Sequence, residues 1–119
     1  MAEIQNSKQY DLEDRTLEFA KRVNNYVNKL SKTTSNREVG SQLVRSASSV
    51  GANYIEANES LSKKDFVMRI KICRKEAKES RYWLLLTESS SDLKEEDDHL
   101  IKESTELMKI FGAILEKSK

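Results

Sequence analysis

Apolar and small residues recur at alternating steps of four and three positions in four separate stretches of the chain. This spacing puts them on one face of an α-helix, as in helices that pack along their length. We therefore expect four helices: from Asp11 to about Lys32, from Ser35 to about Leu61, from Ser62 to the residues before Thr87, and from Asp92 to about Lys117. The residues expected in the core are Leu12, Thr16, Phe19, Val23, Tyr26, Leu30, Val39, Leu43, Ala47, Val50, Tyr54, Ala57, Leu61, Phe66, Ile70, Cys73, Ala77, Ser80, Leu84, Leu93, Leu100, Ser104, Leu107, Phe111 and Ile114.

The starts of the last three helices coincide with capping signals. Ser35, Ser62 and Asp92 each precede an acidic residue by three positions, the spacing at which two side chains bond the free amides of a first turn. The connections between helices are only a few residues long, so neighbouring helices must run antiparallel. The pattern thus predicts an all-α fold, an antiparallel up-down-up-down four-helix bundle.

Composition supports this fold class and narrows the function. The 119 residues include no Pro and three Gly, which are too few turn-forming residues for a many-stranded protein. We expect a flexible tail at residues 1–10 and a single domain at 11–119. One Cys and one His supply neither a disulfide nor a zinc site, and no apolar run reaches the roughly 18 residues of a membrane span. We expect a soluble, cytoplasmic protein without a metal, a cofactor or a membrane partner.

The third helix carries a second apolar stripe, nearly opposite its core face. A helix in a monomeric bundle needs only one buried stripe, so the second one predicts contact with another subunit. The alternative is that neighbouring helices of the same subunit wrap far enough to cover it. The stripe consists of Met68, Ile72, Trp83 and Leu86.

A basic face lies between these two stripes. The segment from Lys63 to Arg81 has eight basic and three acidic residues, a net charge of +5. A basic stripe that includes an aromatic residue is typical of proteins that bind a phosphate backbone, so the partner would be RNA or DNA. The candidate nucleic-acid-binding residues are Lys64, Lys71, Arg74, Lys75, Lys78, Arg81 and Tyr82.

An acidic segment follows directly and offers another reading of the basic face. From Asp92 to Glu106 there are seven acidic and two basic residues, a net charge of −5. The third and fourth helices are neighbours in the sequence, so the acidic face could neutralise the basic one within a subunit. In that case the protein is a structural or protein-protein scaffold with no nucleic-acid binding.

Few residues of the sequence suggest a catalytic site or a small-molecule site. His99 stands alone in an acidic first turn, where a surface or capping role is expected, and Cys73 lies on the core seam, where it acts as a small hydrophobe. The chain has no glycine-rich phosphate loop and no Glu-x-x-His pair of the kind that di-iron bundles use. We expect no enzymatic activity and no small-molecule substrate.

A polar stripe accompanies the apolar seam of the second helix. It could be a surface, a hydrogen-bond network that fixes helix register, or part of a subunit interface, and a structural role is favoured. Its members, Arg45, Ser49, Asn53, Glu56 and Ser60, recur at steps of three and four residues.

These residues also carry a resemblance. The progression Gln42, Arg45, Ser49-Val50, Asn53 and Glu56, followed by Phe66, Cys73-Arg74 and Glu79, resembles the 23S ribosomal RNA intervening-sequence proteins, a family of bacterial four-helix bundles. The resemblance extends over roughly Phe19 to Leu115. The chain departs from the common pattern in having Val44-Arg45 where many members have two Arg, Ala57 for Gly, and Lys75-Glu76 for Gly-Ser.

The resemblance implies a fold and an assembly more than a reaction. It implies a homo-oligomer, in particular a homopentameric ring, and a relative found with diversity-generating retroelements implies nucleic-acid binding. The family-motif residues Gln42, Arg45, Ser49, Asn53, Glu56 and Glu79 are expected to be structural. We thus expect a self-assembling bundle that binds nucleic acid, in particular RNA, with the scaffold as the alternative.

Overall fold

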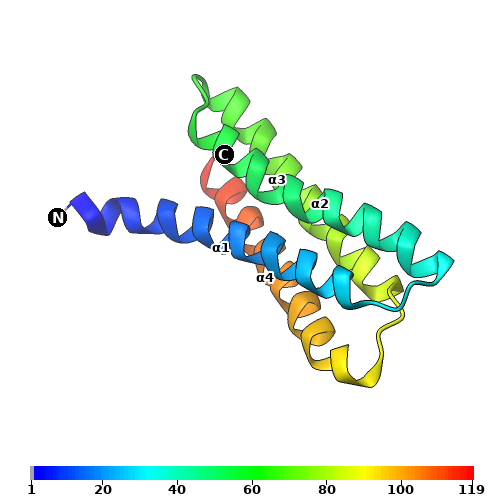
Figure 1. Ribbon diagram of the computed structural model, residues 1–119. Helices are drawn as coiled ribbons and strands as arrows, with labels where there is room; N and C mark the ends of the chain where they lie inside the picture. The colour runs from blue at the N-terminus through cyan, green and yellow to red at the C-terminus, as the bar shows by residue number, and fades with distance from the viewer. Residues whose placement is uncertain (1) are drawn as a thin grey trace.

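The structure is a computed structural model that describes the backbone of residues 2–119 and the side chains of residues 12–119. Four α-helices follow one another: α1 (Ala2–Lys29), α2 (Thr34–Asn58), α3 (Lys63–Leu86) and α4 (Lys94–Lys117), the last preceded by one 3-10 turn, η1 (Ser91–Leu93). Successive helices run in opposite directions (Figure 1), and each packs against the next, while α1 also meets α4. The predicted all-α four-helix bundle is confirmed.

The predicted seams form the core. Nearly all of their residues are buried, including Thr16, Ser80 and Ser104, whose small polar side chains bond carbonyl groups of their own helices. Leu61 is the exception: it is fully exposed, because α2 ends at Asn58 and the helical spacing no longer applies. Three further seam residues, Val39, Phe66 and Ile114, are only half-buried.

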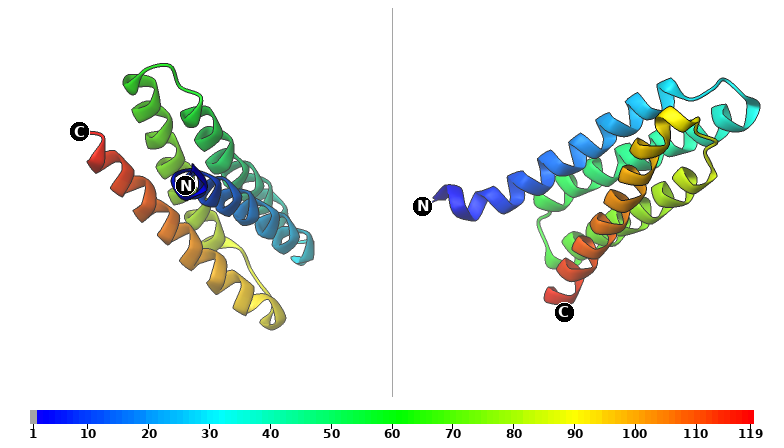
Figure 2. Two further views of the ribbon diagram at one scale, coloured as in Figure 1. Left: turned by 90° about the vertical axis from the view of Figure 1, so that its left-hand side faces the viewer. Right: turned by 90° about the horizontal axis from the view of Figure 1, so that it is seen from below.

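The first helix begins earlier than the apolar pattern predicted. It starts at Ala2 rather than at Asp11, and its first turns extend past the other helices (Figure 2). No Gly or Pro interrupts residues 2–11, so nothing in this stretch stops the helix. The flexibility of the tail at residues 1–10 stays a prediction, and Met1 lies outside the described residues.

Of the three predicted caps, only one is in place. The Ser62 hydroxyl accepts the amide of Asp65 at 3.1 Å, as expected. The cap of α2 is Thr33, not Ser35: the Thr33 hydroxyl accepts the amide of Asn36 at 3.0 Å. Asp92 does not cap α4, because it lies in η1 and accepts a hydrogen bond from the Ser90 hydroxyl instead.

Glycine allows α1 and α2 to approach closely. A Cβ atom added at Gly40 would lie 2.9 Å from a methyl carbon of Val27, and one at Gly51 would lie 3.0 Å from the Thr16 hydroxyl oxygen. A side chain at Gly40 would therefore require the Val27 side chain to move, and one at Gly51 would require Thr16 to yield by a few tenths of an ångström. Gly112 in α4 has no such neighbour within 4 Å.

Polar groups tie the two loops at one end of the bundle together. The Asn36 side chain donates to the carbonyl groups of Ser31 and Glu88, and accepts the Glu88 amide at 2.9 Å. Next to it, the buried Tyr26 hydroxyl lies 2.7 Å from the Thr87 hydroxyl. Residues far apart in the sequence thus fix the connection from α3 to α4.

Asp97 is buried beside this cluster and is incompletely paired. Its Oδ1 atom has no hydrogen-bond partner, and the Ser89 hydroxyl approaches Oδ2 only to 3.5 Å. Burial raises the pKa of Asp97, because removal from water disfavours the charged form. The carboxylate therefore destabilises the fold at neutral pH.

The glycine contacts predict opposite effects for two identical changes. Gly40→Ala should lower the free energy of unfolding by about 1–2 kcal/mol, because the clash with Val27 exceeds the gain in helix propensity. Gly112→Ala, the matched control in open space, should raise it by up to about 1 kcal/mol. Urea denaturation of both variants checks this, and stabilisation by Gly40→Ala would contradict the close approach.

Asp97 predicts a pH-dependent effect. Asp97→Asn should raise the free energy of unfolding at pH 7 by about 1 kcal/mol, because it removes a buried and unsatisfied charge. Since the folded-state pKa is raised, the wild type recovers as the pH falls, and the difference should vanish below the ordinary value of 3.8. Urea denaturation between neutral and acidic pH measures it, and a difference that does not change with pH would contradict the assignment.

Candidate nucleic-acid interface

The basic residues of α3 lie along one exposed side of the helix. Lys64, Lys71, Arg74, Lys75 and Lys78 are all exposed. Among residues 12–119, none of these five forms an ion pair with a carboxylate within 4 Å. No carboxylate of the described side chains therefore holds any of these five cations in an ion pair.

Two shallow depressions lie on this side of α3. One, of about 400 Å³, is lined by Lys71, Arg74, Lys75 and Lys78 together with Leu115 of α4. The other, of about 500 Å³, is lined by Lys63, Lys64, Val67, Met68 and Lys71. No carboxylate lines either depression, and Lys71 belongs to both, so the positive surface runs along α3 without interruption.

Two acidic residues of α4, Glu96 and Glu103, are bonded to α1. Arg15 donates two hydrogen bonds to the Glu103 carboxylate, at 2.7 and 2.8 Å, and Arg22 donates two to Glu96, at 2.9 and 2.6 Å. These bonds hold the pKa of Glu96 below its ordinary range. In the part of the chain with described side chains, no ion pair joins α3 to α4, so the alternative in which α4 neutralises α3 finds no support in the geometry.

The last two members of the candidate basic set differ from the first five. Arg81 is half-buried on the side of α4, where its Nε donates to the Thr105 hydroxyl at 3.1 Å. Tyr82 is 56% exposed and meets the edge of Trp83 at a centroid distance of 5.0 Å. Tyr82 is therefore open to a partner, whereas Arg81 is held against its own bundle.

The second apolar stripe is only partly covered within the chain. Trp83 and Ile72 are half-buried, and Trp83 packs against the core, as the single-subunit alternative expected. Met68 and Leu86 remain 51% and 44% exposed. The Trp83 indole N–H is buried without a hydrogen-bond partner among the described residues. The stripe's role in assembly stays a prediction.

The family-motif residues lie mainly on the surface of α2 that borders α3. Asn53 is the one that joins the two helices: its Oδ1 accepts Arg69 Nη1 at 2.9 Å, while its Nδ2 donates to the Ser49 carbonyl. Gln42, Arg45 and Glu56 are exposed, as is Glu79 on α3. Burial, together with the neighbouring Glu79, raises the pKa of Glu76, while Arg45 and Lys75 favour its charged form.

Cys73 and His99 are the two side chains whose chemistry the sequence analysis weighed for catalysis. Cys73 is buried as predicted, and burial raises the pKa of its thiol to about 12, so the thiol stays protonated at neutral pH. His99 is exposed on α4. Within the described side chains, no three His, Cys, Asp or Glu residues gather as a metal site would require, and no described helix has the length and hydropathy to span a membrane.

Sequence reasoning missed three features of this region: the contact of Arg69 with Asn53, the position of Leu115 beside the α3 lysines, and the pairing of α1 with α4. A signal for the pairing existed. Arg15 and Arg22 are seven residues apart, and so are Glu96 and Glu103, the spacing at which charges flank a helix seam.

Comparison with known proteins identifies the family of this chain. A family model described as 23S rRNA-intervening sequence protein matches residues 8–113. The chain belongs to this family. No curated protein matches the chain.

A solved structure of a similar protein has the same fold. It is described as a protein with unknown function from the S23 ribosomal protein family of Bacteroides thetaiotaomicron VPI-5482. The two chains share 32% identity over 92% of this chain and 98% of that one, with a TM-score of 0.78. The resemblance to intervening-sequence proteins read from α2 and α3 is thereby confirmed.

The ion-pair pattern predicts which charges stabilise the fold. Arg22→Gln should lower the free energy of unfolding by up to about 1 kcal/mol, because Glu96 loses both hydrogen bonds. The double variant Lys71→Glu with Lys75→Glu should change it by no more than about 0.5 kcal/mol, because neither exposed lysine forms an ion pair with a described side chain. Urea denaturation of both variants and the wild type, at one protein concentration, measures these changes in the free energy of unfolding.

The effect of Arg22→Gln should also shrink as the pH falls. The pKa of Glu96 is lowered in the fold, so the pair stabilises above the ordinary value of 4.5 and less as Glu96 becomes protonated. A large loss of stability in the lysine variant would instead favour the neutralised, scaffold reading.

Proposed function

We propose that this protein is a non-enzymatic member of its family that assembles into a homo-oligomeric ring, a homopentamer, and binds RNA through the basic side of α3. The observation that carries the proposal is the row of cations at Lys71, Arg74, Lys75 and Lys78, which have no carboxylate partner within the described part of the chain. Such a row attracts a phosphate backbone, because each neutralised phosphate releases bound counterions.

The shape of the region supports a backbone ligand rather than a small molecule. The depression beside Leu115 is shallow and its polar rim is entirely cationic, so it offers charge but no enclosed pocket with convergent donors and acceptors. The cations recur about once per helical turn of roughly 5.4 Å, which suits an extended polyanion. The exposed Tyr82 adds a ring on which a base can stack.

RNA is proposed ahead of DNA because the description of the family names 23S rRNA. Self-assembly is supported by the exposed apolar side chains of α3, which include Met68, Leu85 and Leu86. The subunit number of five rests on the resemblance to the family. A ring would bring several copies of the α3 cations to one polyanion and strengthen weak contacts by multivalency.

Binding is tested by titrating labelled single-stranded RNA, duplex RNA and duplex DNA with the full-length protein. Affinity should fall steeply between about 50 and 200 mM salt. Lys71→Glu with Lys75→Glu should lower the affinity for RNA at least about tenfold and reduce the slope of log K against log salt by roughly two.

The matched control is Lys29→Glu with Lys102→Glu, an equal change of charge at exposed residues outside α3. It should weaken binding far less than the α3 variant. Light scattering on the same samples reports the mass of the free protein. Absence of binding at low salt, with assembly intact, would refute the RNA proposal and leave a scaffold; equal loss in both variants would show an unspecific charge effect.

A further inference from the structure

The cations of α3 lie in one line with an exposed aromatic ring. Lys71, Lys75, Lys78 and Tyr82 follow one another at steps of four, three and four residues, so they share one face of the helix. All four are exposed, and the Tyr82 ring rests against Trp83 at a centroid distance of 5.0 Å. We call these four residues the α3 row. The row is a line of three positive charges that ends at a ring open to solvent.

Leu115 of α4 adds an apolar surface beside the lysines of the α3 row. It is half-buried and lines the depression of about 400 Å³, in which every other lining residue is a cation of α3. Glu116, the carboxylate that follows it in the sequence, is held by Lys119 at 2.7 Å. An apolar floor thus lies among cations here, and an aromatic ring lies next to them at Tyr82.

The acidic residues of α3 lie on another side of the helix. At about 100° per residue, Asp65, Glu76 and Glu79 are turned by roughly 80° to 140° from Lys71. Arg45 of α2 acts electrostatically on Glu76, which places that carboxylate toward α2. The α3 row is therefore bordered by carboxylates on the side of α2, and by cations and Leu115 on the side of α4. A polyanion on the row is directed toward Leu115.

Double-stranded RNA has no means of using the ring and the apolar floor. Its bases are stacked inside the helix, its major groove is too deep and narrow for side chains to read, and its outside presents phosphates and ribose. Because α3 packs against both α2 and α4, it is not a free helix that could enter a groove. A single strand, in contrast, exposes the faces of its bases, and aromatic side chains stack on them.

The arrangement of the charges also fits one strand. Lys71 and Lys78 are seven residues apart, so the lysines span about 10 Å along a single line. One backbone can follow such a line, whereas the two backbones of a duplex lie on either side of a groove. The second strand of a duplex would therefore gain no contact with the α3 row.

We propose that the α3 row and Leu115 select single-stranded RNA. The phosphates of one strand lie along the lysines, and unstacked bases contact the Tyr82 ring and the apolar floor at Leu115. The inference rests on the proposed binding of RNA and names its substrate class. The depression offers no side-chain acceptor, so the bases are held mainly by their faces and different sequences are tolerated.

The wild-type protein tests the inference with three ligands of equal length. These are a single-stranded RNA of about 12 nucleotides, the same strand with abasic ribose at every position, and the duplex with its complement. Charge alone predicts equal binding of the first two and no weaker binding of the duplex, which has twice the phosphates. The inference predicts that the single strand binds at least about threefold more tightly than the duplex and about tenfold more tightly than the abasic strand.

A neutral double variant assigns the preference to its residues. Tyr82→Ala with Leu115→Ala should lower the affinity for the single strand at least about tenfold and change that for the duplex by no more than about twofold. No charge changes, so the slope of log K against log salt should stay the same. The matched control is Leu17→Ala with Ile55→Ala, at apolar residues that are 52% and 50% exposed outside α3. It should change neither affinity.

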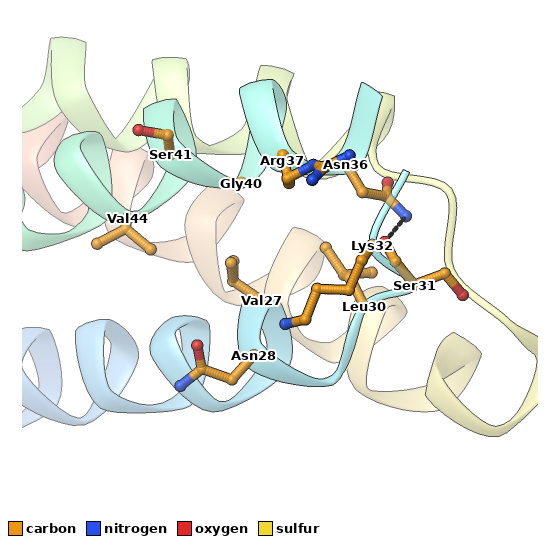
Figure 3. A pocket seen from close by; sticks show the side chains of 10 residues that line it. All are labelled: Val27, Asn28, Leu30, Ser31, Lys32, Asn36, Arg37, Gly40, Ser41 and Val44. Atoms are coloured by element: carbon orange, nitrogen blue, oxygen red, sulfur yellow. Dashed lines mark hydrogen bonds between the residues drawn. The ribbon is translucent and has the colours of Figure 1, made fainter. Parts of the chain in front are cut away.

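A second cationic depression supplies the control for charge. It lies between α1 and α2, has a volume of about 310 Å³ and is lined by Lys32 and Arg37 over an apolar floor (Figure 3). None of its lining residues is aromatic, and its two cations come from a loop and from α2 rather than from one row. Lys32→Glu with Arg37→Glu should therefore leave the ratio of single-strand to duplex affinity unchanged.

The outcomes separate the inference from the proposed function. RNA binding in which the duplex or the abasic strand binds as tightly as the single strand would overturn the inference and leave the proposed function standing. No binding of any RNA at low salt would overturn both. Urea denaturation and light scattering on the Tyr82 and Leu115 variant report its folding and assembly, and the three-ligand comparison decides without any variant.

Discussion

The distribution of charge in this bundle depends on the two Arg–Glu pairs that join α1 to α4. Arg15 meets Glu103 and Arg22 meets Glu96, an antiparallel arrangement in which a step of seven residues forward along α1 matches a step of seven residues back along α4. These pairs hold Glu96 and Glu103 of α4 against α1. A chain with a formal net charge of only +1 can therefore present a strongly positive surface on one helix. The positive charges of α3 and the negative charges of α4 form no ion pairs with each other within the described side chains, although the two helices pack together.

Periodicity was sufficient to predict the core, since the residues that repeat on each helix face are the ones that are buried. Leu61 shows the limit: its position fitted the seam, but the helix had already ended. Caps were harder, because Thr33 and Ser35 are both suitable and only the conformation of the turn decides which hydroxyl receives the amide of Asn36. A helix can be recognised from its own residues, whereas its exact ends depend on competition among neighbours.

The sequence predicted which residues make up the candidate interface, but not which of them are bonded to other residues of the bundle. The cations of α3 could be found by counting, yet whether they had partners depended on how the helices are arranged in space. Arg69 and Arg81 illustrate this, because both belong to the basic segment and both are bonded within the bundle, to Asn53 and Thr105. Sequence spacing assigns a side chain to a direction around its own helix. Only the packed structure shows what lies in that direction.

The small residues of α2 have a consequence for the cooperativity of folding. Gly40 and Gly51 admit α1 at close range, but each lowers the intrinsic tendency of α2 to be helical by up to about 1 kcal/mol relative to Ala. The serine and asparagine residues around these glycines have low helix propensity, so this stretch would not form a stable isolated helix in water. The helix that contacts both α1 and α3 thus owes its conformation to its neighbours, which makes the bundle a single cooperative unit rather than an assembly of two independent hairpins.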